Sequence, residues 1–216
     1  MTLMMLTSLM NDKLLTRINI PDHILTGLKV KYAGPNRFYH TWDHIKTMFN
    51  AACVYDLKLT PEQEWAILYH DAVYFIGTKS YSDIIAEQTS ARLAFDELEG
   101  ILSLDSRKEI YSYIMATAFH TSYDEGFDQK TKVVLDLDLY SMSTYDYVKN
   151  NAGIYKECMY YGISKEDYIK NRIKFLKKML ERKQIFYYDI FNEKMARYNL
   201  EFEYHMLTLQ YKVNYD

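Results

Sequence analysis

The chain has 216 residues, 49% of them hydrophobic and 25% charged, which is long enough to bury a core and is typical of a globular protein. A net charge of −3, with no cluster of lysines and arginines, argues against nucleic acid as a partner. The two cysteines, Cys53 and Cys158, lie far apart, which gives no support to a disulfide framework or a structural zinc site.

The first ten residues, "MTLMMLTSLM", are apolar, and they are followed by Asn11 and Asp12. They are too short to cross a bilayer, and no basic region precedes them, so they predict a first helix that packs on the core. We therefore expect no membrane partner. Together with the unpaired cysteines, this predicts a location in the reducing cytoplasm.

The remaining chain is predicted to be helical, because only seven glycines and three prolines interrupt long segments with helical spacing of apolar residues. Thr60 and Gln63 form a capping box around Pro61, and Gly100 marks a helix end. The expected helices cover, in chain order, residues 21–31, 41–57, from 61 onward, 83–100, about 105–120, 145–161, from 164 onward and about 188–209.

One segment carries a conflicting signal. In "KVVLDLDLYSM", residues 132–142, the apolar residues alternate with aspartates, and a period of two is typical of a strand. A single strand in a helical chain has no partner to pair with, so we predict a helix or a short turn. With no repeat and no linker, the sequence predicts one all-α domain, a helical bundle over residues 1–216.

Histidines and aspartates gather in short motifs. In "YHTWDH", His40 and His44 lie about 40° apart around a helix, so both rings project from nearly one face. In "YHDAVY", His70 and Asp71 lie about 100° apart, and both reach one ion only if it sits over the face between them. Their apolar surroundings predict burial, and a cation offsets the cost of a buried carboxylate. A lone His-Asp pair, however, is common by chance.

Five motifs follow one another in a fixed order, and this order resembles the HD-domain metal-dependent phosphohydrolases. The branch that it resembles has an Arg-x-Tyr-His-Thr-x-x-His start, a His-Asp-x-x-Tyr centre, a Glu-x-x-Ser-Ala helix, a Thr-x-x-His and an Asp-x-Asp-Leu end. The matching residues are Arg37, Tyr39, His40, Thr41 and His44; His70, Asp71 and Tyr74; Glu87, Ser90 and Ala91; Thr117 and His120; and Asp136, Asp138 and Leu139. The resemblance implies an HD-type core over about residues 28–140, with C-terminal helices 144–216 packing on it.

The resemblance also implies a metal site. Its ligands are His44, His70, Asp71 and Asp138, with Asp136 as the competitor for the last position. Asp138 is preferred because it directly precedes the leucine. Two nitrogens and two oxygens suit one divalent ion, which can be Mn²⁺, Co²⁺, Ni²⁺, Fe²⁺, Mg²⁺ or Zn²⁺. Such an ion lowers the pKa of water and polarises a phosphoryl group.

Three residues are implied to be catalytic. Asp71 acts at the metal, Glu87 accepts a proton from water, and His120 donates a hydrogen bond to the phosphoryl oxygen or the leaving group. The alternative for Glu87 is an ordinary surface glutamate. The alternative for His120 is a structural role, in which its positive charge complements the dipole at a helix C-terminus.

Three further residues are expected to bind the substrate. Arg37 offers a bidentate fork for phosphate oxygens. His40 either donates to phosphate, supports a metal ligand, or packs at the start of a helix. Tyr74 is expected to wall the pocket and stack on a base, and Trp42 and Tyr69 are expected to wall it with Tyr74.

The function expected from these features is hydrolysis of a small phosphorylated molecule, for which a nucleotide is favoured. The alternative is a protein that keeps the HD metal site and binds a nucleotide or a partner without turnover. A third possibility is a purely structural helical domain, which predicts that no metal copurifies.

Overall fold

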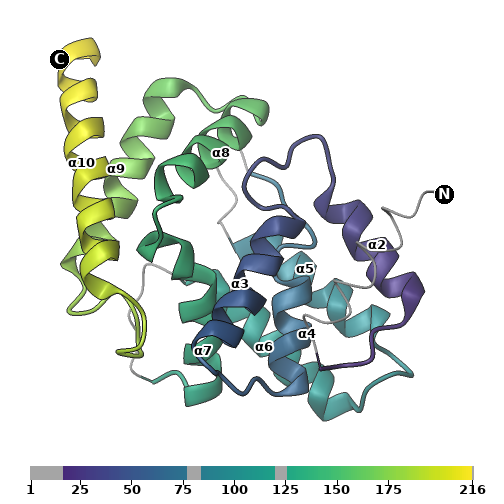
Figure 1. Cartoon of the computed structure of the whole chain (residues 1–216). Coiled ribbons are helices and arrows are strands. Elements are labelled where there is room, and N and C mark those ends of the chain that lie inside the picture. Colours follow the sequence, from purple (N-terminus) through teal and green to yellow (C-terminus); the bar gives the residue numbers. More distant parts are fainter. Residues whose placement is uncertain (1–16, 77–83, 120–125, 216) are drawn as a thin grey trace, which may run out of the picture.

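The computed structural model describes residues 17–76, 84–119 and 126–215. The regular structure of these residues is entirely helical, which confirms the predicted fold class. Figure 1 shows the helices as a bundle with α10 along one side. The elements are α2 (Asp22–Tyr32), α3 (Trp42–Val54), α4 (Pro61–Tyr69), α5 (Ile84–Glu97), α6 (Leu104–Thr117), α7 (Gln129–Leu139), the 3₁₀ helix η1 (Tyr140–Ser143), α8 (Tyr147–Tyr160), α9 (Lys165–Glu181) and α10 (Glu193–Tyr215).

Local sequence signals fix several helix ends. Thr60 and Gln63 form the predicted capping box at the start of α4, and the Ser164 hydroxyl accepts from the backbone N–H of Asp167 at the start of α9. Gly100 and Gly162 have φ values of +77° and +75° just after α5 and α8. This left-handed conformation favours glycine and stops each helix.

Helix α7 explains the misleading alternation in its sequence. It packs against α3, α4, α6 and η1, and each residue from 134 to 139 is buried. A helix that is covered on several sides has no single apolar face, so its apolar pattern loses the helical period. The preferred interpretation of this segment as a helix is confirmed.

The last expected helix differs from the structure in its bounds. The last helix begins at Glu193 and not near residue 188. In the turn before it, the backbone N–H groups of Tyr187 and Tyr188 donate to the carboxylate of Asp136 on α7 and so are held outside the helix. The Asn192 side chain then accepts from the backbone N–H of Met195 in the first turn of α10. The helix expected over residues 1–10 lies outside the described residues. No described helix is long and apolar enough to cross a membrane.

Candidate metal centre

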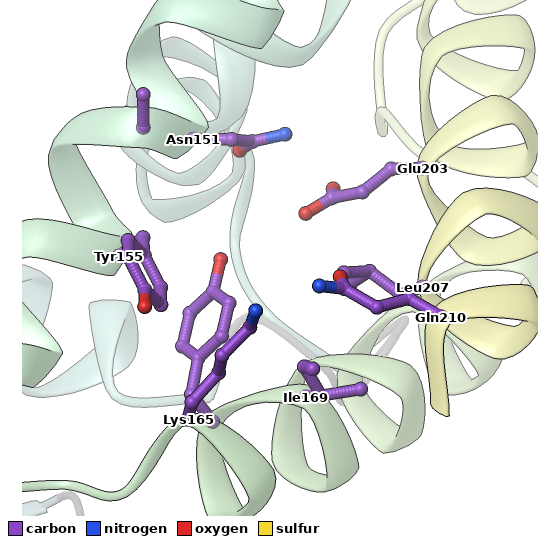
Figure 2. Close-up of a pocket in the computed structure, with 9 residues that line it drawn as sticks. Asn151, Tyr155, Lys165, Ile169, Glu203, Leu207 and Gln210 are labelled. Atoms are coloured by element: carbon purple, nitrogen blue, oxygen red, sulfur yellow. The ribbon is translucent and has the colours of Figure 1, made fainter. Parts of the chain in front are cut away.

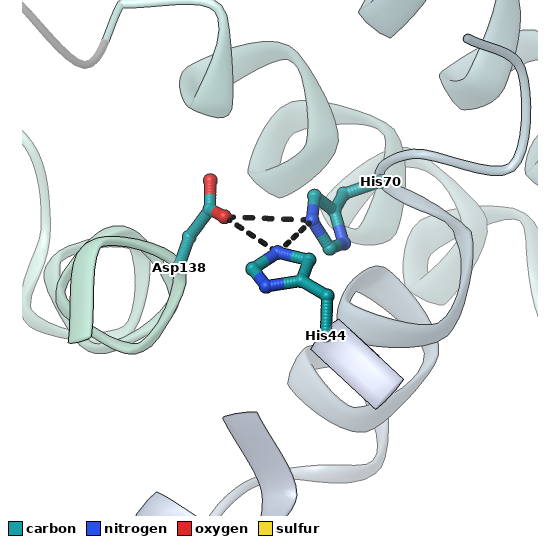
Figure 3. Close-up of side chains that lie close together, drawn as sticks. All are labelled: His44, His70 and Asp138. Atoms are coloured by element: carbon teal, nitrogen blue, oxygen red, sulfur yellow. Dashed lines mark hydrogen bonds and ion pairs between the residues drawn. The ribbon is translucent and has the colours of Figure 1, made fainter. Parts of the chain in front are cut away.

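Three predicted ligands meet in the interior. The Nε2 atoms of His44 and His70 lie 3.3 Å apart, and Oδ1 of Asp138 lies 3.1 Å from the first and 3.5 Å from the second. Figure 3 shows the three side chains pointing toward one another from separate segments. Oδ2 of Asp71 lies 3.0 Å from Nε2 of His70 and 3.9 Å from Nε2 of His44. All four predicted ligands therefore face one small region, here called the metal cluster.

The fold delivers each ligand from a rigid element. His44 lies in the first turn of α3, and Asp138 lies in the last turn of α7. His70 caps the C-terminus of α4, and Asp71 follows it directly. Nδ1 of His70 is 2.9 Å from the carbonyl oxygen of Ile67, so it donates its proton there and leaves the Nε2 lone pair for a cation.

The distances in the metal cluster fit coordination of one ion. Two atoms that each lie about 2.1 Å from a single metal are separated by about 3.0 to 4.2 Å, depending on the angle between them. The ligand atoms of His44, His70 and Asp138 lie 3.1 to 3.5 Å from one another, and Oδ2 of Asp71 lies 3.0 and 3.9 Å from the two imidazole nitrogens. The buried His-His-Asp group in a helical bundle is compatible with an HD-type metal site.

The electrostatics of the cluster also favour a cation. Burial lowers the pKa of His70, but the carboxylates of Asp71 and Asp138 raise it by more, and the result lies well above the ordinary value. Burial raises the pKa of Asp71, whereas His70 and His40 hold it well below the ordinary value. The two carboxylates thus create a negative potential at the buried imidazoles, and this potential favours a bound cation.

Asp136, the competitor for the last ligand position, lies elsewhere. Its two carboxylate oxygens accept from the backbone N–H groups of Tyr187 and Tyr188 at 2.9 and 2.8 Å. It therefore anchors the turn before α10, and Asp138 is the aspartate that reaches the metal cluster.

Glu157, on α8, organises the segment that carries His40. One of its oxygens accepts from the backbone N–H groups of Phe38, Tyr39 and His40 at 2.7, 2.7 and 3.0 Å. The other accepts from Nδ1 of His40 at 2.6 Å and from the hydroxyl of Tyr74 at 3.0 Å. Burial raises the pKa of Glu157, but these bonds and the charge of His40 bring it down to about 2.

Arg37 is turned toward the backbone. Its Nη1 donates to the carbonyl oxygens of His40 and Asp71 at 3.0 and 2.7 Å, and its Nη2 donates to that of Ala72 at 3.1 Å. The guanidinium also lies 5.2 Å from the ring centre of Tyr74. Arg37 thus ties the His40 segment to the His70–Asp71 turn, which differs from the phosphate contact that the sequence predicts for it.

The aromatic residues that the sequence predicts as pocket walls pack elsewhere. The ring of Tyr74 stacks on His40 with ring centres 4.3 Å apart, and Arg37 also lies over the Tyr74 ring. Tyr69 is buried in the core and donates its hydroxyl proton to Glu97 at 2.8 Å. Trp42 packs against the same core. Tyr74 thus contacts His40, and none of the three rings is among the residues that line the cavity beside the metal cluster.

A cavity of about 310 Å³ opens beside the metal cluster. His40, Glu87 and Asp138 contribute to its wall from the segment before α3, from α5 and from α7. The opposite elements, α8 and α9, contribute polar side chains that the sequence did not single out. These are Asn150, Asn151 and Arg172.

A second cavity, of about 360 Å³, lies between α8, α9 and α10. Figure 2 shows Asn151 and Glu203 pointing into it from facing helices. Glu203 accepts from Arg172, which lines the first cavity, and Asn151 lines both. The Arg172–Glu203 ion pair therefore forms part of the partition between the two spaces.

His120 lies outside the described residues, so its predicted role stays a prediction. Comparisons with protein-family models, curated proteins and solved structures gave no match to this chain. The residues of the site themselves therefore carry the functional inference.

Sequence reasoning missed Glu157 because the segment that it holds, residues 38–40, lies more than a hundred positions away in the chain. One local signal was present. Gly153 lies four residues earlier, on the same helical face, and a Cβ there would lie 2.8 Å from the carbonyl oxygen of Phe38. A small residue one turn from a glutamate can mark a face on which a helix approaches another segment closely.

Proposed function

We propose that this chain is a metal-dependent phosphohydrolase of the HD-domain type, acting on a small phosphorylated molecule, with a nucleotide as the favoured substrate. The observation that carries the proposal is the buried group of His44, His70 and Asp138, with Asp71 beside it. A mixed nitrogen and oxygen donor set suits a divalent ion used in hydrolysis better than a structural zinc site.

The chemistry divides between the ion and the cavity wall. A divalent ion held by the cluster would polarise the phosphoryl group and favour deprotonation of the attacking water. Glu87 lines the same cavity as Asp138, and we assign it the role of accepting the proton of that water. Burial lowers the pKa of His40, but Asp71 and Glu157, which accepts from Nδ1, raise it above its ordinary value. The protonated ring then has its Nε2–H to donate to a phosphoryl oxygen. His120 remains a candidate for assisting the leaving group.

The first test is elemental analysis of the purified protein, followed by hydrolysis assays on a panel of nucleotides with added Mn²⁺, Co²⁺ or Mg²⁺. We expect phosphate release that a chelator abolishes. Asp71→Ala should lose the metal and the activity. Asp43→Ala is the matched control, because Asp43 lies beside His44 in sequence but is exposed.

The outcomes separate the competing functions. Full metal occupancy in Asp71→Ala would remove Asp71 from the ligand set, and activity without metal would contradict the mechanism. A protein that holds metal and nucleotide tightly but releases no phosphate would support the alternative, a non-catalytic binding protein. A protein that binds no divalent ion would leave only a structural role.

A further inference from the structure

The α8–α9 wall of the cavity beside the metal cluster carries polar groups that the proposed chemistry does not use. Arg172 donates to both carboxylate oxygens of Glu203 at 2.9 and 3.0 Å, and its Nη2 also donates to Oδ1 of Asn151 at 2.9 Å. Within the part of the chain that the structure describes, Nη1 of Arg172 and the side-chain amide of Asn150 have no hydrogen-bond partner in the protein. Both residues line the cavity.

Among the residues that the structure describes, the charges around this cavity are closely balanced. A divalent ion would be matched by the carboxylates of Asp71 and Asp138. Glu203 matches Arg172, and Glu157, 2.6 Å from His40, cancels any positive charge on that ring. The described wall therefore offers no surplus positive charge.

This balance separates classes of phosphorylated substrate. Sites that bind triphosphates neutralise the extra phosphoryl charges with lysines, arginines or additional metal ions. Here a single phosphoryl group could lie on the metal, but the described wall has no unmatched cation for a second or third. The amides and the paired guanidinium suit hydroxyl and ring-nitrogen groups, which form neutral hydrogen bonds.

The size of the cavity points the same way. Its volume of about 310 Å³ lies at the lower end of the roughly 300–1,000 Å³ found for small-molecule sites. Such a space suits one nucleoside or one sugar better than a dinucleotide.

We propose that the substrate is a phosphomonoester with a single phosphoryl group and an uncharged, hydroxyl-bearing leaving group, which Asn150, Asn151 and Arg172 bind. This inference rests on the proposed hydrolase function. In the reaction, water oxygen bonds to phosphorus and the ester P–O bond breaks. The leaving oxygen takes up a proton, which gives inorganic phosphate and the free alcohol.

The test compares kcat/KM for a nucleoside 5′-monophosphate, a sugar monophosphate, the matching nucleoside triphosphate and p-nitrophenyl phosphate, which lacks hydroxyl groups on its leaving group. At least one monophosphate should be preferred over the triphosphate by about tenfold or more. Asn150→Ala should lower kcat/KM for that monophosphate roughly tenfold relative to p-nitrophenyl phosphate, which is the worth of about one hydrogen bond. The matched control is Asn171→Ala, because Asn171 is exposed on α9 next to Arg172.

Each result decides one part of the proposal. Equal or better use of the triphosphate would overturn the charge argument. An equal loss on both monoesters in Asn150→Ala would overturn the recognition role of Asn150. If no ester is hydrolysed, the proposed function fails, and calorimetric binding of the same nucleotides to the metal-loaded protein decides the inference by itself. Tighter binding of the monophosphate, weakened in Asn150→Ala, would support it, and equal binding would overturn it.

Discussion

Helix α7 carries two buried aspartates that belong to two different regions of the molecule. Asp136 faces the turn before α10, where two backbone N–H groups donate to it, whereas Asp138 faces the imidazole nitrogens of His44 and His70. Both side chains are buried and both come from one "LDLDL" run. Burial alone therefore does not identify a metal ligand; the kind of donor that faces the carboxylate does.

Glu157 plays the same role as Asp136, and we call these two residues the anchor carboxylates. Each holds a non-helical segment by accepting hydrogen bonds from backbone N–H groups. In the metal cluster, Asp71 and Asp138 instead face the imidazole nitrogens of His44 and His70. Anchor carboxylates should govern folding, and cluster carboxylates should govern metal binding. Substitutions in the two groups test this distinction.

The largest effect is expected for Asp138→Asn. The amide keeps the shape of the side chain but loses the charge that a divalent ion requires, so metal content should fall to background and hydrolysis should fall at least about a hundredfold. Elemental analysis and kcat measure these losses. Asp136→Ala is the internal control, because it should retain the metal when compared at the same folded fraction. Loss of metal from both variants would erase the distinction.

The next effect is expected for Glu157→Gln, which we predict to cost about 3 kcal/mol of unfolding free energy at pH 7 because five hydrogen bonds converge on the carboxylate. The pKa of Glu157 lies at about 2 in the folded protein, below the ordinary 4.5. Its stabilisation is therefore present above about pH 4.5 and is lost as the pH falls toward 2.

Urea unfolding at several pH values measures this dependence. The free-energy difference between the original protein and Glu157→Gln should shrink by about 2 kcal/mol from pH 6 to pH 3. A difference that stays constant over this range would show that ionisation of Glu157 does not stabilise the fold.

Asp136→Ala should give a smaller effect with the opposite pH dependence. Burial raises the pKa of Asp136 from 3.8 to about 7, although the two backbone N–H groups act against it. Between these two pKa values the folded state keeps a proton that the unfolded chain releases. Stability therefore falls as the pH rises from about 3.8 to about 7. The substitution should cost about 2 kcal/mol at pH 5 and close to nothing at pH 8. A cost that grows with pH would contradict this account.

Much of the fold follows from local signals. Thr60, Ser164 and Gly100 act on backbone groups within a few residues of themselves, so the helix ends that they mark are visible in the sequence. The order of the motifs likewise identified His44, His70 and Asp138 as candidate ligands from the sequence. The structure brings these three together from α3, the end of α4 and α7.

The rest depends on contacts between distant segments. Glu157 binds a loop more than a hundred residues earlier, and Asp136 binds a turn about fifty residues later. The local sequence around either carboxylate does not identify the segment that the carboxylate binds. Arg37 is the converse case. A bidentate side chain inside a motif favours a phosphate contact, yet in the structure backbone carbonyl oxygens accept its hydrogen bonds.

The smallest effect is expected for Arg37→Lys, which separates the two roles of this residue. A lysine keeps the charge but cannot reach the carbonyl oxygens of His40, Asp71 and Ala72 together, so stability should fall by about 1 kcal/mol. Metal affinity should fall roughly tenfold, because the turn that carries Asp71 is less firmly held. At saturating metal, KM should stay within about twofold of the original value. If Arg37 instead binds the phosphate, KM should rise tenfold or more at full metal occupancy while the unfolding midpoint stays unchanged.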